Sequence, residues 1–466
     1  MKITGSKFAV VVFASLFACI ALVGGLGCSV AQDEAARAAE NSSSKSARLQ
    51  AGALDPTFGI GGKVTTVVGT GSAEITGIAL QKLHGKNGQK YVVSGTASNG
   101  SDLDFVVARY NQDGTLDPSF GTGGLTQTNI GTENDATWGL GIQHDGKIVV
   151  AGYAYNGRFK NFAVVRYTVD GDLDTTFGSG GKVLTAIGPG SSVGRAIALD
   201  HDRIIVGGYS ARKALDTPGG RVAASATDTF TVVRYDSNGN LDGSFGDGGI
   251  VTFSSIPEVS RVHGEMLVNE DGQLIAGGVL EADEVKYDVL TVRFNDDGTL
   301  DSSFGSGGMV TTRIGPKDDV PLSSALQEDG KILQAGYSTT AVQNFMVVRH
   351  NADGSPDTSF GVNGAVVTPF VDGALSAVRG VALQEDGKIV ALGRAGGTKL
   401  EFAVARYTSA GELDTTFAGG TVLTDFGTGS DKGNAVLIYK RRIIGGGVSG
   451  PRFALAAYGV GNEDDD

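Results

Sequence analysis

Three side chains able to bind a small molecule occupy one equivalent position in separate copies of an internal repeat. Trp138, Arg195 and Arg379 stand where short apolar segments begin, and another copy has Thr76 there. An indole and two guanidinium groups suit an anionic or sugar-like ligand, because the ring stacks on apolar faces and the cations bind carboxylates. Ordinary packing and solvated charge would account for the same residues, so a ligand site formed by this set is a hypothesis.

A second candidate group lies in a loop that differs from copy to copy. Tyr155 and Arg158 are followed directly by Phe159 and Lys160. Residues that recur in every copy maintain a scaffold, whereas residues that differ at equivalent positions can specify a ligand. We therefore assign Tyr155 and Arg158 to the same ligand-binding face. The longest variable loop, residues 210–229, belongs to that face as well.

One recurring motif resembles a calcium-binding loop. Residues 295–301 read Asn-Asp-Asp-Gly-Thr-Leu-Asp, but Arg293 stands at the first ligand position and would repel a cation. Calcium needs six or more oxygen ligands, and other copies lose some of these. A β-turn explains the Asp and Gly equally well. We expect a turn with no metal and no cofactor, and calcium is the alternative.

No catalytic residue is predicted. Residues 190–194 fit the pattern Gly-x-Ser-x-Gly, but strands are expected on both sides, whereas a nucleophile elbow leads into a helix. The histidines show no close pairing: His84, His144, His201, His263 and His350. Glycoside cleavage needs two carboxylates at a set separation, which the sequence cannot select.

The elements that would position these residues come from a repeat of about 60 residues. A marker of the form Leu-Asp-x-x-Phe-Gly recurs, with its aromatic ring at Phe58, Phe120, Phe177, Phe245, Phe304, Phe360 and Phe417. Each unit contains four short, β-branched runs separated by Asp-Gly or Gly-rich turns. This pattern is typical of propeller blades, so we predict an all-β, seven-bladed β-propeller with four-stranded blades.

The phase of the repeat predicts a closed ring. The chain enters with one outer strand, residues 63–67, and leaves with three strands at residues 434–439, 443–448 and 453–458. Three strands from the end and one from the start would make the seventh blade. Closure of this kind removes exposed sheet edges.

A second marker predicts a brace within each blade. An arginine near the end of the third strand recurs in six copies: Arg109, Arg166, Arg234, Arg293, Arg349 and Arg406. We expect each to pair with the marker aspartate of its blade, at Asp117, Asp174, Asp242, Asp301, Asp357 or Asp414. The seventh copy has Ala457 instead, in the one blade whose third and fourth strands are not joined by a turn.

The N-terminus has the pattern of an export signal. Lys2 and Lys7 precede a nearly apolar run at residues 8–26, which ends in small residues before Cys28. This pattern predicts a signal peptide over 1–27 with lipidation of Cys28. Cleavage after Ala31 and a retained membrane helix are the alternatives. We then expect a flexible tether over 28–53, the propeller over 54–460 and an acidic tail over 461–466.

Composition limits the partners. The formal net charge is −13, which disfavours nucleic acid because its binding needs clustered Lys and Arg. The only cysteines are Cys19 and Cys28, so the folded part has no disulfide. We expect a monomer at the cell envelope (outer membrane or periplasm), or a secreted one. Its partners would be the membrane, through the lipid, and a glycan or protein ligand.

The repeat resembles the delta-60 repeat family. The resemblance rests on residues 162–167 (Phe-Ala-Val-Val-Arg-Tyr), the marker at 173–183 and the Ala-Leu-Gln-x-Asp-Gly-Lys-Ile segment at 382–389, and it covers residues 54–458. It departs at Pro356, Ala418 and Ala457, which we interpret as local drift. The resemblance implies an exported bacterial repeat protein with no defined activity. We therefore expect a non-enzymatic binding module; an extracellular polysaccharide or peptide hydrolase or lyase is the first alternative and a structural envelope protein the second.

Overall fold

The computed structural model describes residues 49–83, 88–211, 228–253, 260–283, 286–370 and 373–461. The chain divides into two units, Met1–Arg48 and Leu49–Asp466, and only the second contains described residues. The expected signal peptide, Cys28, most of the tether and residues 462–466 of the acidic tail therefore lie outside them. Among the described residues, no helix is long and apolar enough to cross a membrane.

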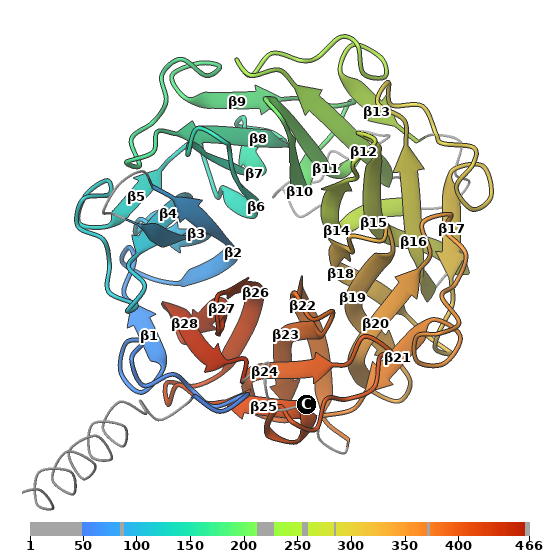
Figure 1. The fold of residues 1–466 in the computed structure, drawn as a ribbon. Coiled ribbons are helices and arrows are strands. Elements are labelled where there is room, and N and C mark those ends of the chain that lie inside the picture. The colour runs from blue at the N-terminus through green and yellow to red at the C-terminus, as the bar shows by residue number, and fades with distance from the viewer. Residues whose placement is uncertain are drawn as a thin grey trace, which may run out of the picture. The chain divides into compact units, whose positions relative to one another are not determined.

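The second unit is a ring of seven antiparallel sheets with four strands each (Figure 1). The first three blades are β2–β5 (Ala73–Lys82, Gln89–Ser98, Leu103–Tyr110, Leu125–Thr128), β6–β9 (Ala136–Ile142, Ile148–Tyr155, Lys160–Tyr167, Lys182–Thr185) and β10–β13 (Ser192–Asp200, Arg203–Ala211, Asp228–Tyr235, Ile250–Thr252). The next three are β14–β17 (Ser260–Val268, Leu274–Asp283, Lys286–Phe294, Met309–Thr312), β18–β21 (Asp319–Leu326, Ile332–Thr339, Gln343–His350, Ala365–Thr368) and β22–β25 (Leu375–Leu383, Ile389–Gly396, Leu400–Tyr407, Thr421–Thr424). A short 3-10 turn, η2 (Ala418–Gly420), precedes β25. The predicted seven-bladed, all-β propeller is confirmed.

The seventh blade closes the ring from both ends of the propeller. It contains β26 (Asp431–Tyr439), β27 (Arg442–Ser449) and β28 (Arg452–Gly459), with β1 (Lys63–Thr66) as its outer strand. Strand β1 pairs antiparallel with β28 from Lys63 opposite Ala456 to Thr66 opposite Phe453, and in Figure 1 the two lie side by side. The predicted closure is therefore correct.

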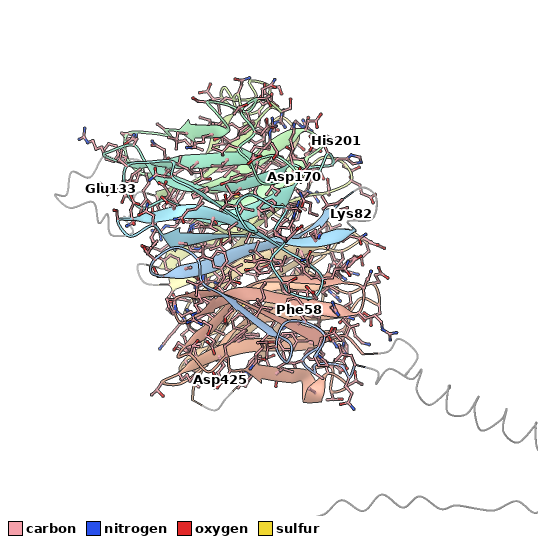
Figure 2. All side chains as sticks on the ribbon, turned by 90° about the vertical axis from the view of Figure 1, so that its left-hand side faces the viewer. Phe58, Lys82, Glu133, Asp170, His201 and Asp425 are labelled. Atoms are coloured by element: carbon pink, nitrogen blue, oxygen red, sulfur yellow. The ribbon has the colours of Figure 1, made fainter. Side chains whose placement is uncertain are left out.

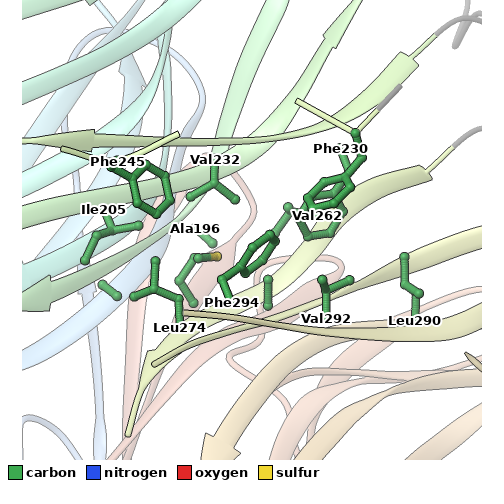
Figure 3. Packing of buried hydrophobic residues seen from close by; sticks show 14 residues of the cluster. Ala196, Ile205, Phe230, Val232, Phe245, Val262, Leu274, Leu290, Val292 and Phe294 are labelled. Atoms are coloured by element: carbon green, nitrogen blue, oxygen red, sulfur yellow. The ribbon is translucent and has the colours of Figure 1, made fainter. Parts of the chain in front are cut away.

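The core lies between neighbouring blades. One cluster combines Ile205 and Val232 of the third blade with Leu274 and Phe294 of the fourth (Figure 3). Because the middle strands are covered on both faces, runs such as residues 162–165 are apolar without alternation. Each fully buried Leu or Phe contributes about 1.5–3 kcal/mol, so contacts between sheets hold the ring together.

The marker arginine joins two blades as well as bracing its own. Arg166 donates from Nε to Asp174 at 2.8 Å, as the spacing suggested, but through a single nitrogen rather than a bidentate pair. Its Nη1 donates to the carbonyl of Ser237 in the next blade at 2.5 Å, and its guanidinium lies 4.5 Å from the Phe177 ring. The same three contacts recur at Arg109, Arg234, Arg293, Arg349 and Arg406. We call this set the interblade clasp.

The change from Arg to Ala at position 457 has a structural explanation other than local drift of the repeat. In the seventh blade, residues from other strands form the interblade clasp. Arg442, at the start of β27, pairs through Nε with Asp55 at 2.5 Å and donates to the Gln112 carbonyl at 2.7 Å. The marker ring of Phe58 packs edge-on against Tyr91 of the first blade, with the ring centroids 6.3 Å apart. The clasp that closes the ring therefore joins the C-terminal blade to the segment before β1 and to the first blade.

Candidate functional site

The innermost strand of every blade carries a β-bulge at the central channel. Each bulge leaves at least one residue outside the sheet pairing, and such residues can be turned towards the axis. In six blades the bulge contributes a single residue to the channel wall, and these are Thr76, Trp138, Arg195, Leu322, Arg379 and Asn434. The structure thus brings together Trp138, Arg195 and Arg379, which the sequence aligned, around one cavity of about 320 Å³.

The fourth blade departs from this pattern and supplies two ionisable groups. In β14 the pairing jumps from Val262 to Met266, so His263, Gly264 and Glu265 leave the ladder together. His263 and Glu265 both line the cavity. In the sequence, His263 is one of five histidines without close pairing, and no motif singles out Glu265. The sequence did contain a signal for this departure. His263 aligns with Arg195, and the fourth blade has one more residue after this position than the other blades.

Glu265 is held in place by the neighbouring blade. Its Oε2 accepts hydrogen bonds from the Ser323 hydroxyl and the Ser324 amide, both at 3.0 Å. Ser323 in turn accepts a bond from the amide of Val381 in the sixth blade, so three blades fix this carboxylate. Desolvation by the surrounding blades raises the pKa of Glu265 to about 7, in spite of the two donors, although the side chain remains exposed to the channel.

The cationic residues of the cavity lack carboxylate partners. Arg195, Arg379 and Arg394 make no ion pair with any described acid, unlike the clasp arginines, and the Nε of each is buried without a hydrogen bond. Burial, together with the neighbouring Arg394 charge, lowers the pKa of Arg379. Burial and the charges of Arg195, Arg261 and Arg379 hold the pKa of His263 well below its usual range, so its imidazole is neutral at pH 7.

A second tier of aromatic and basic side chains surrounds the cavity mouth. They come from five blades. Arg261 stands on the first strand of its blade, two residues before the bulge. The others stand on the second strand, opposite that position: Tyr153, Tyr209, Tyr337 and Arg394. The Arg195 guanidinium lies 4.6 Å from the Trp138 ring and 5.8 Å from that of Tyr209. Arg261 lies 5.5 Å from Tyr209 on its other side and pairs with Asp228 at 3.0 Å.

The predicted loop residues divide between the mouth and the outer surface. Lys160 places Nζ 4.2 Å from the Tyr153 ring and 5.7 Å from that of Tyr155, so Tyr155 adjoins the second tier. Arg158 is exposed at the loop tip, 4.8 Å from the Phe159 ring, and is not a residue of the cavity wall. Most of the 210–229 loop lies outside the described residues.

The cavity mouth lies on one face of the propeller. The hairpins that join the first and second strands of each blade lie on the opposite face. Figure 2 shows Glu133, in the loop leading into β6, on one side, and Lys82 and His201 on the other. The variable loops therefore share the side of Glu133. The cavity opens among residues that differ between blades, while the clasps lie among residues that repeat.

The other sequence motifs have structural roles. Asn295 donates to Thr299 Oγ1 at 3.0 Å and Asp297 accepts from the Thr299 amide at 2.9 Å, so the calcium-like segment is an internally bonded turn. No group of three or more potential metal ligands occurs among the described residues. The Gly-x-Ser-x-Gly segment connects β9 to β10, and His350 Nε2 lies 2.8 Å from Thr312 Oγ1, where other blades have a Tyr–Thr bond.

Comparison with known proteins supports the fold and its repeats. Five segments, residues 90–120, 143–177, 270–304, 327–360 and 384–417, match a family described as "Domain of unknown function (DUF5122) beta-propeller". These five segments are therefore similar to the repeats of that family. No curated protein sequence matches the chain.

Solved structures share the architecture at low identity. They include a protein of unknown function from Dyadobacter fermentans (11% identity, 85% of this chain and 99% of that one, TM-score 0.41). Chaetomium thermophilum Sqt1 bound to the N-terminus of ribosomal protein L10 (11%, 85% and 98%, 0.43) and polysaccharide lyase Uly1 (11%, 82% and 89%, 0.44) are two others. Similarity at this level concerns the propeller fold alone.

Proposed function

We propose that this protein is a non-catalytic binding module whose central channel receives an anionic ligand. The supporting observation is the excess of cationic groups at the cavity: Arg195 and Arg379 line it, Arg394 adjoins Arg379, and none of the three has a carboxylate partner among the described residues. An enclosed charge without a counter-ion costs free energy, because the surrounding protein solvates it less well than water. A bound carboxylate or phosphate would remove that cost and form charge-assisted hydrogen bonds.

The ligand is a sugar acid rather than a simple ion. The cavity of about 320 Å³ has room for a small organic molecule, and the Trp138 indole in its wall offers a face for the apolar side of a sugar ring. Thr76 and Asn434, from the first and seventh blades, add neutral polar groups to the wall. This combination matches a ligand with one negative charge, several hydroxyls and an apolar face.

Calorimetric titration of the purified full-length chain with galacturonic acid, and with galactose as the neutral control, tests this function. We expect binding of the acid only. Arg195→Ala should weaken it by ten- to a hundredfold, because a charge-assisted bond contributes about 1.5–3 kcal/mol. Lys82→Ala, an exposed lysine on the opposite face, is the matched control and should bind normally. Equal binding of acid and neutral sugar, or no loss in the Arg195 variant, would contradict the proposal.

Export and lipidation belong to the same proposal. The basic, apolar and small-residue order of residues 1–28 supports a signal peptide followed by an acylated Cys28. A lipid at that position would tether the propeller to the cell envelope as a monomer. A Cys28→Ser variant should be released from membranes; retention of the variant in the membrane fraction would refute lipidation at this residue.

A second candidate function is a hydrolase or lyase acting on acidic polysaccharide. The observation in its favour is that a neutral imidazole, His263, and a carboxyl with a pKa near 7, Glu265, line one cavity. Groups of this kind serve as base and acid near neutral pH. New reducing ends released from polygalacturonate by the wild type but not by Glu265→Gln would establish it. Absence of any release would leave binding as the function.

A further inference from the structure

The cavity continues outward as a line of alternating aromatic and basic side chains on one part of the rim. Starting in the second blade, Tyr155, Lys160 and Tyr153 lie in contact, with the two rings 6.4 Å apart between centroids. Trp138 and Arg195 follow at the cavity. Tyr209 and Arg261 complete the line in the third and fourth blades. We call these seven residues the mouth arc.

The mouth arc is electrostatically continuous. The Arg195 charge adds to burial in lowering the pKa of Lys160, so the two cations act on each other. Asp228, paired with Arg261, terminates the arc at its far end. Because like charges held together repel, Lys160 and Arg195, which have no ion pair with a described acid, favour a ligand with more than one negative charge.

The tyrosines of the mouth arc differ from those of the scaffold. In the scaffold, the hydroxyls of Tyr167 and Tyr235 donate to a threonine of the neighbouring blade at 2.9 and 2.8 Å. Within the described part of the chain, the hydroxyls of Tyr153, Tyr155 and Tyr209 have no such partner, although all three rings are half-buried. Free phenol hydroxyls beside ring faces are suited to sugar hydroxyls and sugar faces.

The rim over the seventh and first blades is different in character. In the seventh and first blades, Asn434 donates to Glu74 Oε1 at 2.7 Å and to the Ile75 carbonyl at 2.8 Å. Thr76 and Thr137 hydroxyls bond each other at 2.6 Å. These polar groups already satisfy one another, and Glu74 is an exposed acid. An extended anion is therefore disfavoured over the seventh and first blades, and the continuous series of ring and cation contacts favours its path over the second to fourth blades.

We propose that the ligand is an acidic oligosaccharide, with one sugar acid in the cavity and the following units along the mouth arc. This inference rests on the proposed function, since the cavity supplies the first subsite. An acidic peptide would offer the same charges, but it would not use the unpartnered tyrosine hydroxyls, and we treat it as an outcome of the test. The negative formal charge of the whole chain, −13, opposes a long polyanion and favours a short segment of a few units.

The test compares galacturonic acid, its linear trimer and hexamer, and hexaglutamate by calorimetry on the full-length chain. We expect the trimer to bind at least tenfold more tightly than the monomer, because added subsites act within one ligand. Lys160→Ala should remove most of that gain and weaken the trimer much more than the monomer, whereas Arg195→Ala should weaken both. Lys82→Ala serves as the control for loss of a lysine on the other face.

The outcomes separate this inference from the proposed function. Monomer and trimer of equal affinity would overturn the oligosaccharide inference and leave the channel site standing. Binding of neither would overturn both. Tighter binding of hexaglutamate than of the trimer would replace the saccharide by an acidic peptide. A trimer advantage that survives in Lys160→Ala would refute the mouth arc as the path of the ligand.

Discussion

Replacement of one clasp arginine should destabilise the propeller far more than a surface charge would. Arg166→Ala removes the Nε bond to Asp174, the Nη1 bond to the Ser237 carbonyl and the stacking on Phe177. The two charged side chains are almost completely buried, at 5% and 7% exposure. Loss of one partner from such a pair leaves a buried charge uncompensated, which costs about 3–5 kcal/mol.

The remaining contacts of Asp174 set the value within that range. The carboxylate keeps its bonds from the Thr176 amide and hydroxyl, at 3.1 and 2.6 Å, and Lys147 lies 3.3 Å away. These contacts place the cost of the lost charge at the low end, about 3 kcal/mol. The Ser237 carbonyl, left without its donor, adds about 1 kcal/mol, so we expect a total loss of about 4 kcal/mol.

Equilibrium urea denaturation, followed by circular dichroism, measures this loss. The control is Arg158→Ala, which removes an exposed arginine from the same blade and should change the free energy of unfolding little. Arg166→Lys should recover only part of the loss. An ammonium group cannot bond the Asp174 carboxylate and the Ser237 carbonyl at once and also lie flat on the Phe177 ring. A loss below about 1 kcal/mol in Arg166→Ala, with the sheet signal intact, would refute the clasp as a source of stability.

Three further predictions concern the same framework. Arg442→Ala should lower the free energy of unfolding by about 2 kcal/mol, less than Arg166→Ala, because the Arg442 side chain is 25% exposed. Limited proteolysis should then cut the segment before β1 sooner than in the wild type. Unchanged cleavage would contradict the role of Arg442 in closure. Ala418→Gly should stabilise the propeller by about 0.5–1 kcal/mol in thermal unfolding, because Ala418 has φ of 46° where other blades have Gly. A less stable variant would show that this φ carries no strain. Hydrogen bonds and clasp charges lower the pKa of Asp117, Asp174 and Asp301 to about 2 from 3.8, so their stabilisation is present above pH 4 and is lost as pH falls towards 2. An acid titration of unfolding free energy that stays flat between pH 4 and 2 would oppose this.

The repeat and its phase were readable from sequence because they depend on local chemistry. A glycine at the marker turn is needed where φ is positive: a Cβ at Gly178 would lie 2.4 Å from the Lys182 carbonyl oxygen. Such constraints recur in each copy and give the pattern its period. The count of strands at the two ends then predicts closure, since an incomplete blade would expose a sheet edge.

The candidate site was predicted only in part. Equivalent positions in the repeat brought Trp138, Arg195 and Arg379 together correctly, because blades related by a ring place equivalent residues around one axis. Glu265 was missed, since the extra residue in the bulge of β14 shifts it out of the aligned pattern and into the cavity. No periodicity in the sequence shows which way a bulged residue turns.

What the sequence by itself determined is the all-β repeat, the number of blades and the way the ring closes. Only the tertiary structure decided that each arginine reaches the next blade, that Arg442 replaces the missing seventh arginine, and that Glu265 is fixed by Ser323 and Ser324. The physical reason is one of range. Turns and strands follow from neighbours along the chain, whereas these contacts join side chains about 60 residues apart or at opposite ends of the propeller, and exist only once the blades have packed.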